Sequence, residues 1–326
     1  MSEQDSRKRL QVGGQAVIEG VMMRSPTCIA TAVRTPGGAI VVKKEPFQSF
    51  IKRYRFLNIP IVRGAIAFVE TFIIAIKALS YSAEQATAEK GAEAAAAGAD
   101  ERSAAGEARE QGKSGARGAG AEKGLSTVYI FFTFIAALAI GFAIFFYLPL
   151  RITEWIGFTQ GVLFNLVDGV IRLVFLVLYI VLITRWKEMR RIFEYHGAEH
   201  KAISAFEEEG IATPENVRAY PTVHARCSTS FLLLVVVVSI IVFMFLGRPT
   251  SIPDKIVRFA FIPVIGGISY ELLKLSARPA ARRIMGFLVW PGLVLQKLTT
   301  KEPAPDQIEV AIAALDACLG DKTVES

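Results

Sequence analysis

The sequence predicts a mainly α-helical polytopic membrane protein with about four transmembrane helices, a small N-terminal β module and cytosolic amphipathic helices. Of its 326 residues, 52% are hydrophobic, and the mean hydropathy of +0.40 exceeds that of ordinary soluble chains. Four apolar runs are long enough for a helix to cross a hydrocarbon core of about 30 Å. These runs are 127–150, 161–184, 230–247 and 256–275.

Basic residues set the predicted orientation. The links 151–160 and 248–255 are short and carry few Lys or Arg residues, whereas the N-terminal part, the 185–229 loop and the tail are rich in them. By the positive-inside rule the rich segments are cytoplasmic. We see no apolar signal-peptide core at the N-terminus. We therefore expect a multi-pass protein of the bacterial inner (cytoplasmic) membrane with cytoplasmic N and C termini.

Charge and cysteine usage narrow the classes of partner. A formal charge of +7 favours attraction to the anionic inner leaflet of the lipid bilayer. It does not favour nucleic acid, because no basic groove with interleaved aromatic residues is visible. Protein partners cannot be named, and a homo-oligomer remains open. The chain has an odd number of cysteines, scattered along the sequence at Cys28, Cys227 and Cys318, so no disulfide framework is expected.

Three segments precede the first span. Residues 11–55 predict a small cytosolic β module, with strand-like runs and a Pro-Gly-Gly hairpin turn, too small to hold a core alone. Residues 56–83 predict an interfacial amphipathic helix, or one laid against the bundle, because Arg63, Glu70 and Lys77 recur every seven residues. Residues 84–124, rich in Ala, Gly and Glu, predict a disordered linker that is at most transiently helical.

The remaining segments alternate between membrane and cytosol. We expect transmembrane hairpins at 127–184 and 230–275, separated by a cytosolic loop at 185–229. The cytosolic tail, 276–326, contains an apolar piece at 284–298 that Pro291 interrupts, which suits an interfacial or re-entrant segment. It also contains an amphipathic helix, with apolar residues at helical spacing and a stop at Gly320. These apolar residues are Ile308, Ile312, Leu315 and Leu319.

The stretch FEYHGAEHKAI, residues 193–203, carries an H-x-x-E-H spacing. On a helix His196 and His200 share a face, so two imidazoles can point at one ion, and Glu199 lies close enough to activate water. Inverted-zincin peptidases use this arrangement. The pattern is short, however, and a juxtamembrane helix with Glu, His and Lys is often only a solvated face.

Further candidate ligands lie in the same loop. His224 is the one other histidine of the sequence, and Cys227 follows it three residues later. A catalytic zinc usually takes three protein ligands. We therefore expect His196, His200 and His224 as metal ligands, with Cys227 as a fourth ligand or close neighbour. The cofactor is expected to be a divalent transition metal, with Zn²⁺ favoured over Mg²⁺ or Ca²⁺.

Two other polar features stand out. Asp168 and Arg172 lie four apart in the second apolar run, where an unpaired charge would be costly. They predict either an ion pair that fixes helix packing, which is favoured, or part of a proton or ion path. Residues 12–26 contain Gln15, Glu19 and Arg24 but no phosphate-loop spacing, and on the residues alone they predict a β edge with turn glycines.

Several of these motifs together resemble the YqhQ-like bacterial and plastid membrane proteins, known as domain of unknown function 1385. The similar stretches are GGQAVIEGVMMR (13–24), RG (63–64) with Glu70, DGVIR (168–172), EYHGAEHK (194–201), ENV (215–217), HARCSTSF (224–231) and QKLTTKEP (296–303). Family members usually have Gly where this chain has Ser228.

The resemblance covers nearly the whole chain outside 84–124, and it describes candidate metal-dependent membrane enzymes without an established reaction. It also implies that Gln15, Glu19 and Arg24 support the site. We accordingly expect the β module to pack over the H-x-x-E-H helix and Glu19 to act as an extra ligand or as a partner of the ligands.

Two functions of different classes follow. The preferred hypothesis is a zinc-like metal-dependent membrane hydrolase with a cytosolic-face site, in which Glu199 is the general base. The substrate is not specified by the sequence. The rival is a non-catalytic membrane scaffold or regulator, or a small permease that uses Asp168 and Arg172.

Overall fold

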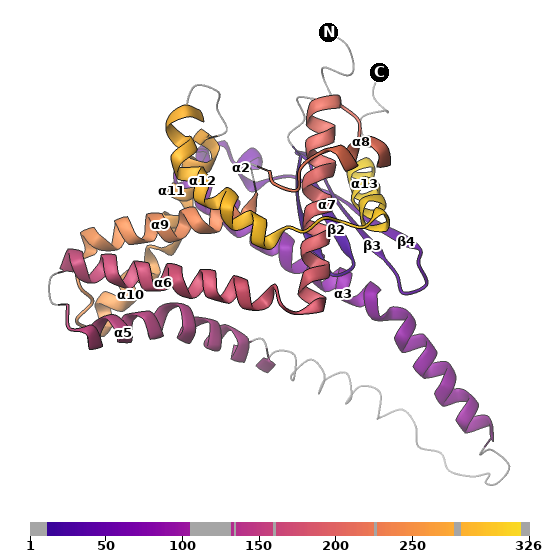
Figure 1. Ribbon diagram of the computed structural model, residues 1–326, viewed down its shortest axis with the longest axis horizontal. Coiled ribbons are helices and arrows are strands. Elements are labelled where there is room, and N and C mark those ends of the chain that lie inside the picture. The colour runs from indigo at the N-terminus through magenta and orange to yellow at the C-terminus, as the bar shows by residue number, and fades with distance from the viewer. Residues whose placement is uncertain are drawn as a thin grey trace.

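The computed structural model describes residues 12–104, 132–133, 135–158, 161–224, 227–276 and 282–320. Most of this part of the chain is helical, and a four-stranded antiparallel sheet precedes the long helices. The apolar helices α5 (Leu148–Ile156), α6 (Gly161–Ile183) and α9 (Ser228–Leu246) lie together. The sheet lies beyond one end of them with α7 (Lys187–Glu209) (Figure 1). The predominance of helix and the small N-terminal sheet confirm this part of the predicted fold class.

The sheet has the strand order β1-β2-β3-β4. Its strands are β1 (Gly13–Val17), β2 (Gly20–Arg24), β3 (Cys28–Arg34) and β4 (Ile40–Pro46). Between β1 and β2 the chain turns at Glu19, which has a φ of 52°. Gly20 is needed after this turn, because a Cβ there would lie 2.2 Å from the Ala32 carbonyl oxygen.

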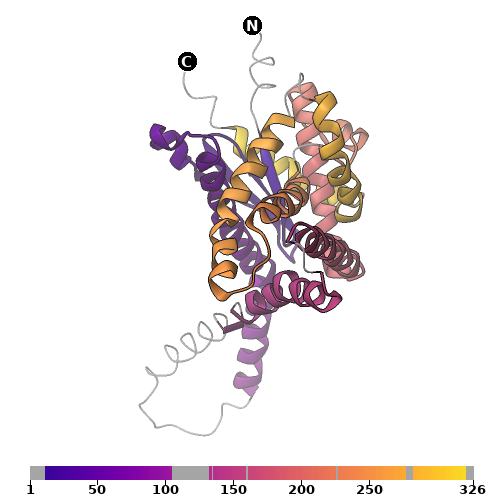
Figure 2. The ribbon, with the colours of Figure 1, turned by 90° about the vertical axis from the view of Figure 1, so that its left-hand side faces the viewer.

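Helices cover both faces of the sheet (Figures 1 and 2). On one face Val17 and Met22 pack with Ile74 of α3 (Val62–Ala104). On the other, Met23 and Ala202 share a core with α13 (Pro305–Leu319). A module of this size cannot bury enough apolar surface by itself, so these helices complete its core.

Four helical segments are long and apolar enough to cross a membrane: Ile135–Ile156, Gly161–Ile183, Thr229–Leu246 and Ile252–Ser276. They contain η2 (Ala143–Tyr147), α5 (Leu148–Ile156), α6 (Gly161–Ile183), α9 (Ser228–Leu246), α10 (Ile252–Ala260) and α11 (Ile262–Ser276). The first segment runs to Ile156, past the predicted end at residue 150, because Arg151 and Glu154 pair across one turn at 2.7 Å and the helix continues. Of its predicted start, residues 127–131 and 134 lie outside the described residues.

The long helix α3 lies against α11, part of a candidate membrane span, as well as against the sheet. Arg63 donates from Nε and Nη2 to the two carboxylate oxygens of Glu271, at 2.6 and 2.5 Å. The helix follows the short turns α2 (Phe50–Arg53) and η1 (Arg55–Leu57). It extends to Ala104, so residues 84–104 are helical where the sequence predicted a disordered linker. Ala and Glu are strong helix formers and propagate the packed helix. Residues 105–124 lie outside the described part.

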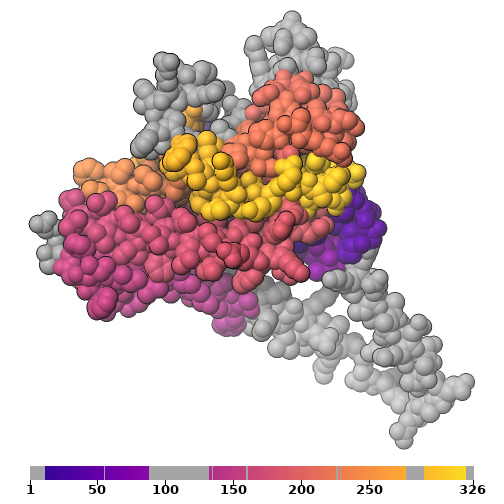
Figure 3. Space-filling model, viewed as in Figure 1, coloured from indigo at the N-terminus to yellow at the C-terminus, as the bar shows by residue number. Residues whose placement is uncertain are grey.

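The C-terminal segment connects the apolar helices with the sheet, because α12 packs on α9 and α13 packs on the sheet. The predicted interfacial or re-entrant piece is part of one helix, α12 (Arg282–Thr299), with Pro291 inside it. It packs along α9, and Gly292 allows this, because a Cβ there would be 2.7 Å from the Ser230 hydroxyl oxygen. In Figure 3 the chain from α12 to α13 forms a band between α6 and the residues of α7 and α8 (Pro214–Ala219).

Substituting Gly267 with alanine is expected to separate α3 from α11. A Cβ at Gly267 would lie 2.3 Å from the Ile61 carbonyl oxygen, so the backbone has to move, at a cost of about 1–3 kcal/mol. Gly266→Ala is the matched control, since its Cβ would make only ordinary contacts, the nearest at 3.7 Å to Phe68. Thermal unfolding in detergent should show a lower Tm for Gly267→Ala alone, and equal Tm values would contradict this helix contact.

Candidate metal centre

The H-x-x-E-H motif lies on α7, one helical turn separating its two histidines. The ring centroids of His196 and His200 are 4.4 Å apart. His196 Nδ1 donates to the Thr299 carbonyl oxygen at 2.8 Å, and His200 Nδ1 donates to that of Thr222 at 2.6 Å. Because a carbonyl only accepts, both protons are on Nδ1 in the neutral rings. Both Nε2 atoms are then available to bind a metal.

Cys227 brings a thiol to the same place. It is the N-cap residue of α9, and its Sγ lies 3.3 Å from His196 Nε2. One ligand atom from each of His196, His200 and Cys227 lies within 4.8 Å of the others, a group called the His–Cys group below. With Zn–N near 2.0 Å and Zn–S near 2.3 Å, tetrahedral ligand atoms lie roughly 3.3–3.6 Å apart. The donor types and the His196–Cys227 distance fit such a metal.

Glu199 lies beside the His–Cys group in a buried position. Its Oε2 is 3.5 Å from His200 Nε2 and 4.0 Å from His196 Nε2. Strand β1 covers it: the Gly14 N–H donates to the carboxylate. Burial raises the pKa of Glu199, and the nearby histidines and the Gly14 N–H oppose this rise. A Cβ on Gly14 would lie 2.8 Å from Glu199 Cγ, so this close approach requires glycine.

His224 lies next to the His–Cys group. Its ring centroid is 5.8 Å from that of His200, and its Nε2 is 3.4 Å from Glu207 Oε2. Gln296 of α12 fixes its backbone, accepting from its N–H at 3.0 Å and donating to its carbonyl at 2.9 Å. Burial lowers the pKa values of both His200 and His224, which favours neutral rings. Of the residues expected as ligands, Cys227 is therefore grouped with His196 and His200, and His224 is their neighbour.

The structure does not bring Gln15, Glu19 or Arg24 to the His–Cys group. Glu19 accepts from Arg191 Nε at 2.5 Å and from the Tyr195 hydroxyl at 3.4 Å, so it ties the β1–β2 turn to the first half of α7. Its predicted role as an extra ligand is not seen. Gln15 pairs with Met22, and their side chains belong to the face of the sheet that packs on α3.

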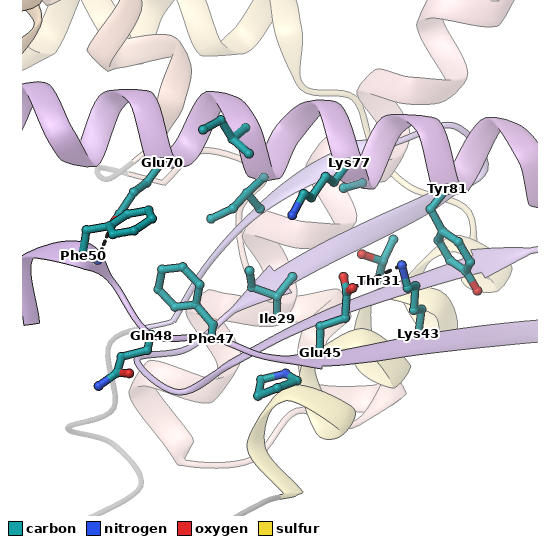
Figure 4. A pocket seen from close by; sticks show the side chains of 14 residues that line it. Ile29, Thr31, Lys43, Glu45, Phe47, Gln48, Phe50, Glu70, Lys77 and Tyr81 are labelled. Atoms are coloured by element: carbon teal, nitrogen blue, oxygen red, sulfur yellow. Dashed lines mark hydrogen bonds and ion pairs between the residues drawn. The ribbon is translucent and has the colours of Figure 1, made fainter. Parts of the chain in front are cut away.

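Arg24 belongs to that face too, where it lies 4.2 Å over the Phe47 ring and 3.5 Å from the Glu70 carboxylate. Glu70 also accepts from the Phe50 N–H at 2.6 Å. A pocket of about 210 Å³ opens between α3, β3 and β4, with Lys43 and Tyr81 at its other end (Figure 4). The segment 12–26 thus serves the His–Cys group through its backbone at Gly14, while its charged side chains hold neighbouring helices.

Residues 299–302, which follow α12, cross over α7 and contact it beside the His–Cys group. The sequence alone did not predict this role. The Lys301 N–H donates to the Phe193 carbonyl at 2.9 Å. Lys201, which is buried, pairs with Glu302. Gly197 allows this close crossing, because a Cβ there would be 2.0 Å from the Lys301 carbonyl oxygen. The similarity of QKLTTKEP (296–303) to the family pointed to this segment. Its residue types did not indicate which main-chain carbonyl would orient His196.

Asp168 and Arg172 lie on α6, a candidate membrane span, outside the His–Cys group. Asp168 and Arg172 form an ion pair at 2.8 Å across one turn of this helix. Arg258 of α10 lies in the same region and donates to the Asn165 side-chain oxygen at 2.7 Å. Neither Asn165 nor Arg258 was singled out in the sequence as part of this cluster.

Comparison with known proteins gives the family. Residues 59–321 match the family described as "Protein of unknown function (DUF1385)". Over 311 residues the chain is 32% identical to "Uncharacterized protein YqhQ" of Bacillus subtilis (strain 168), covering 94% of this chain and 92% of that protein. No solved structure matches the chain. The extent of both matches shows that the chain belongs to the DUF1385 family.

Proposed function

We propose that this protein is a metal-dependent hydrolase of the zinc type, acting on a membrane-associated substrate. One observation carries the proposal: two imidazoles and a carboxylate of α7 converge on one small volume with the thiol that caps α9. Each histidine has its Nδ1 bonded to a main-chain carbonyl. Carbonyl partners of this kind orient metal-binding histidines and are hard to explain as chance packing.

The donor set favours a borderline-soft transition metal. Two imidazoles and a thiolate suit Zn²⁺, whereas Mg²⁺ and Ca²⁺ prefer oxygen ligands. His196, His200 and Cys227 would hold the ion, which leaves a position open for substrate or water. When bound, the metal would supply Lewis acidity, polarising the bond to be cleaved and acidifying water.

Glu199 would move the proton. Its Oε2 faces both ligand histidines, within 4.0 Å of each Nε2, so it lies beside the open position. A water oxygen bonds to the carbonyl or phosphoryl centre while its proton passes to Glu199. The same proton goes to the leaving group as its bond breaks. The Gly14 N–H holds the carboxylate in place for both steps.

The position of the group at the end of the bundle supports a substrate in the membrane interface. Cys227 lies two residues before the candidate span Thr229–Leu246, and α7 begins four residues after the candidate span Gly161–Ile183 ends. A substrate whose scissile bond lies at the depth of the lipid headgroups could therefore reach the His–Cys group. The basic character of the 185–229 loop and of the tail favours the cytosolic face of a bacterial inner membrane.

Elemental analysis of detergent-purified protein tests the metal. We expect near-stoichiometric zinc in the wild type and its loss in His196→Ala and Cys227→Ala, because each removes a ligand. His224→Ala should weaken binding less than either, because His224 is a neighbour of the His–Cys group and not one of its three donors. Cys28→Ala is the control, since Cys28 is buried in the sheet core, in a cluster that does not include the metal ligands. Failure of the folded wild type to take up metal on reconstitution would contradict the proposal and favour a scaffold or regulator.

A further inference from the structure

At the end of the bundle away from α7, a small pocket opens between η2, α9 and α10. Its volume is about 80 Å³, far below the roughly 300 Å³ or more of pockets that hold drug-sized ligands. Phe142, Phe146 and Phe259 form its walls. Its three charged lining residues, Arg172, Lys255 and Arg258, are all basic. Figure 1 places α5 and α10 together at this end.

The two arginines of the pocket keep unused donors. Arg258 is 8% exposed, and its Nη2 donates to Asn165 and to the Gly247 carbonyl oxygen. In the described part of the chain its buried Nη1 has no hydrogen-bond partner, and neither has Arg172 Nε. Unsatisfied guanidinium groups are expensive at membrane depth. An anion in the pocket would satisfy both.

Aspartate alone does not neutralise this cluster. Asp168 pairs with Arg172 through one oxygen, and its other carboxylate oxygen is also without a partner among the described residues. Asp254 is occupied at the start of α10, accepting from Thr250 and Ser251. The pocket itself is therefore lined by positive charge in excess, with an aromatic rather than an acidic wall.

The wall of the pocket continues onto the exposed surface of the candidate membrane spans. Phe142 and Phe259 both belong to candidate membrane spans, and they are 41% and 44% exposed. Lys255, three residues into α10, is exposed at the rim, and Arg258 lies one turn deeper. A ligand with an anionic head and apolar chains would place the head among the basic groups and the chains along the phenylalanines.

From this arrangement we infer a binding site for an anionic phospholipid, whose phosphate lies between Arg172, Lys255 and Arg258 in the leaflet opposite the His–Cys group. A phosphate accepts several charge-assisted hydrogen bonds, and the two unused guanidinium donors would supply them. This site is independent of the proposed hydrolase, because it shares no residue with the His–Cys group.

Native mass spectrometry of the full-length protein, with added phosphatidylglycerol or phosphatidylcholine, tests this inference. We expect preferential retention of phosphatidylglycerol. Retention should fall about five-fold in Lys255→Gln, as loss of one basic contact predicts, and at least ten-fold in Arg258→Gln. Arg248→Gln is the matched control, because Arg248 is a basic residue at the same end that stacks on Phe164 outside the pocket.

Lys255→Gln keeps the test decisive if Arg258→Gln does not fold, since the Lys255 side chain is exposed, whereas that of Arg258 is buried. Equal retention of the two lipids would overturn the site, and so would equal losses in Lys255→Gln and Arg248→Gln. A further arm adds inorganic phosphate alone. If it protects the wild type against heat as well as phosphatidylglycerol does, the site takes a soluble anion and the lipid assignment fails.

Discussion

Exchanging Gly197 for alanine is expected to disable the His–Cys group without altering any of its ligands. The new Cβ would lie 2.0 Å from the Lys301 carbonyl oxygen, which is backbone and cannot rotate away. The chain 299–302 must then lift off α7, and the Thr299 carbonyl moves away from His196. Losing such an orienting partner typically costs 10–100-fold in metal affinity. Overpacking should also lower stability by about 1–3 kcal/mol.

Chelator competition measures the zinc affinity of Gly197→Ala, and thermal unfolding measures its stability. Gly13→Ala is a suitable control, because a Cβ at Gly13 has open space around it. Its neighbour Gly14 should behave like Gly197, since a Cβ there would meet both Glu199 and the Met22 carbonyl oxygen at 2.8 Å. If Gly197→Ala bound zinc with unchanged affinity, the crossing of residue 301 over α7 would not orient His196 as described.

The sequence predicted those parts of the molecule that depend on local pattern. Apolar runs of about 20 residues identify helices that can span a bilayer whatever they pack against. Likewise, Ile308 and Leu315 of α13 are buried as their helical spacing indicated. The prediction of disorder after residue 84 was wrong for residues 84–104. It rested on the lack of large apolar residues, whereas the high helix propensity of Ala and Glu extends a helix that is already packed.

The candidate site was predicted only in part, because its geometry depends on contacts between distant segments. Spacing on one helix was enough to pair His196 with His200. Whether His224 or Cys227 comes nearer to them depends on how the chain enters α9, where Cys227 caps the helix. Glu19 was expected to support the site as an acidic residue in an apolar stretch. It pairs instead with Arg191, which lies on α7, the helix that carries His196 and His200.

Glu199→Gln is expected to separate metal binding from catalysis. Glutamine has the same shape and can still accept the Gly14 N–H, so β1 should stay in place and zinc should be retained. It cannot take a proton from water, and removal of a general base typically slows a reaction 10²–10⁴-fold. The rates are to be compared on whichever vesicle-borne ester, amide or phosphoester the wild type hydrolyses. Glu207→Gln is the control, since Glu207 lies on the same helix as Glu199 but contacts His224, and this variant should lose far less activity. Loss of zinc together with activity in Glu199→Gln would make Glu199 a ligand, and hydrolysis at the wild-type rate would remove it from the mechanism.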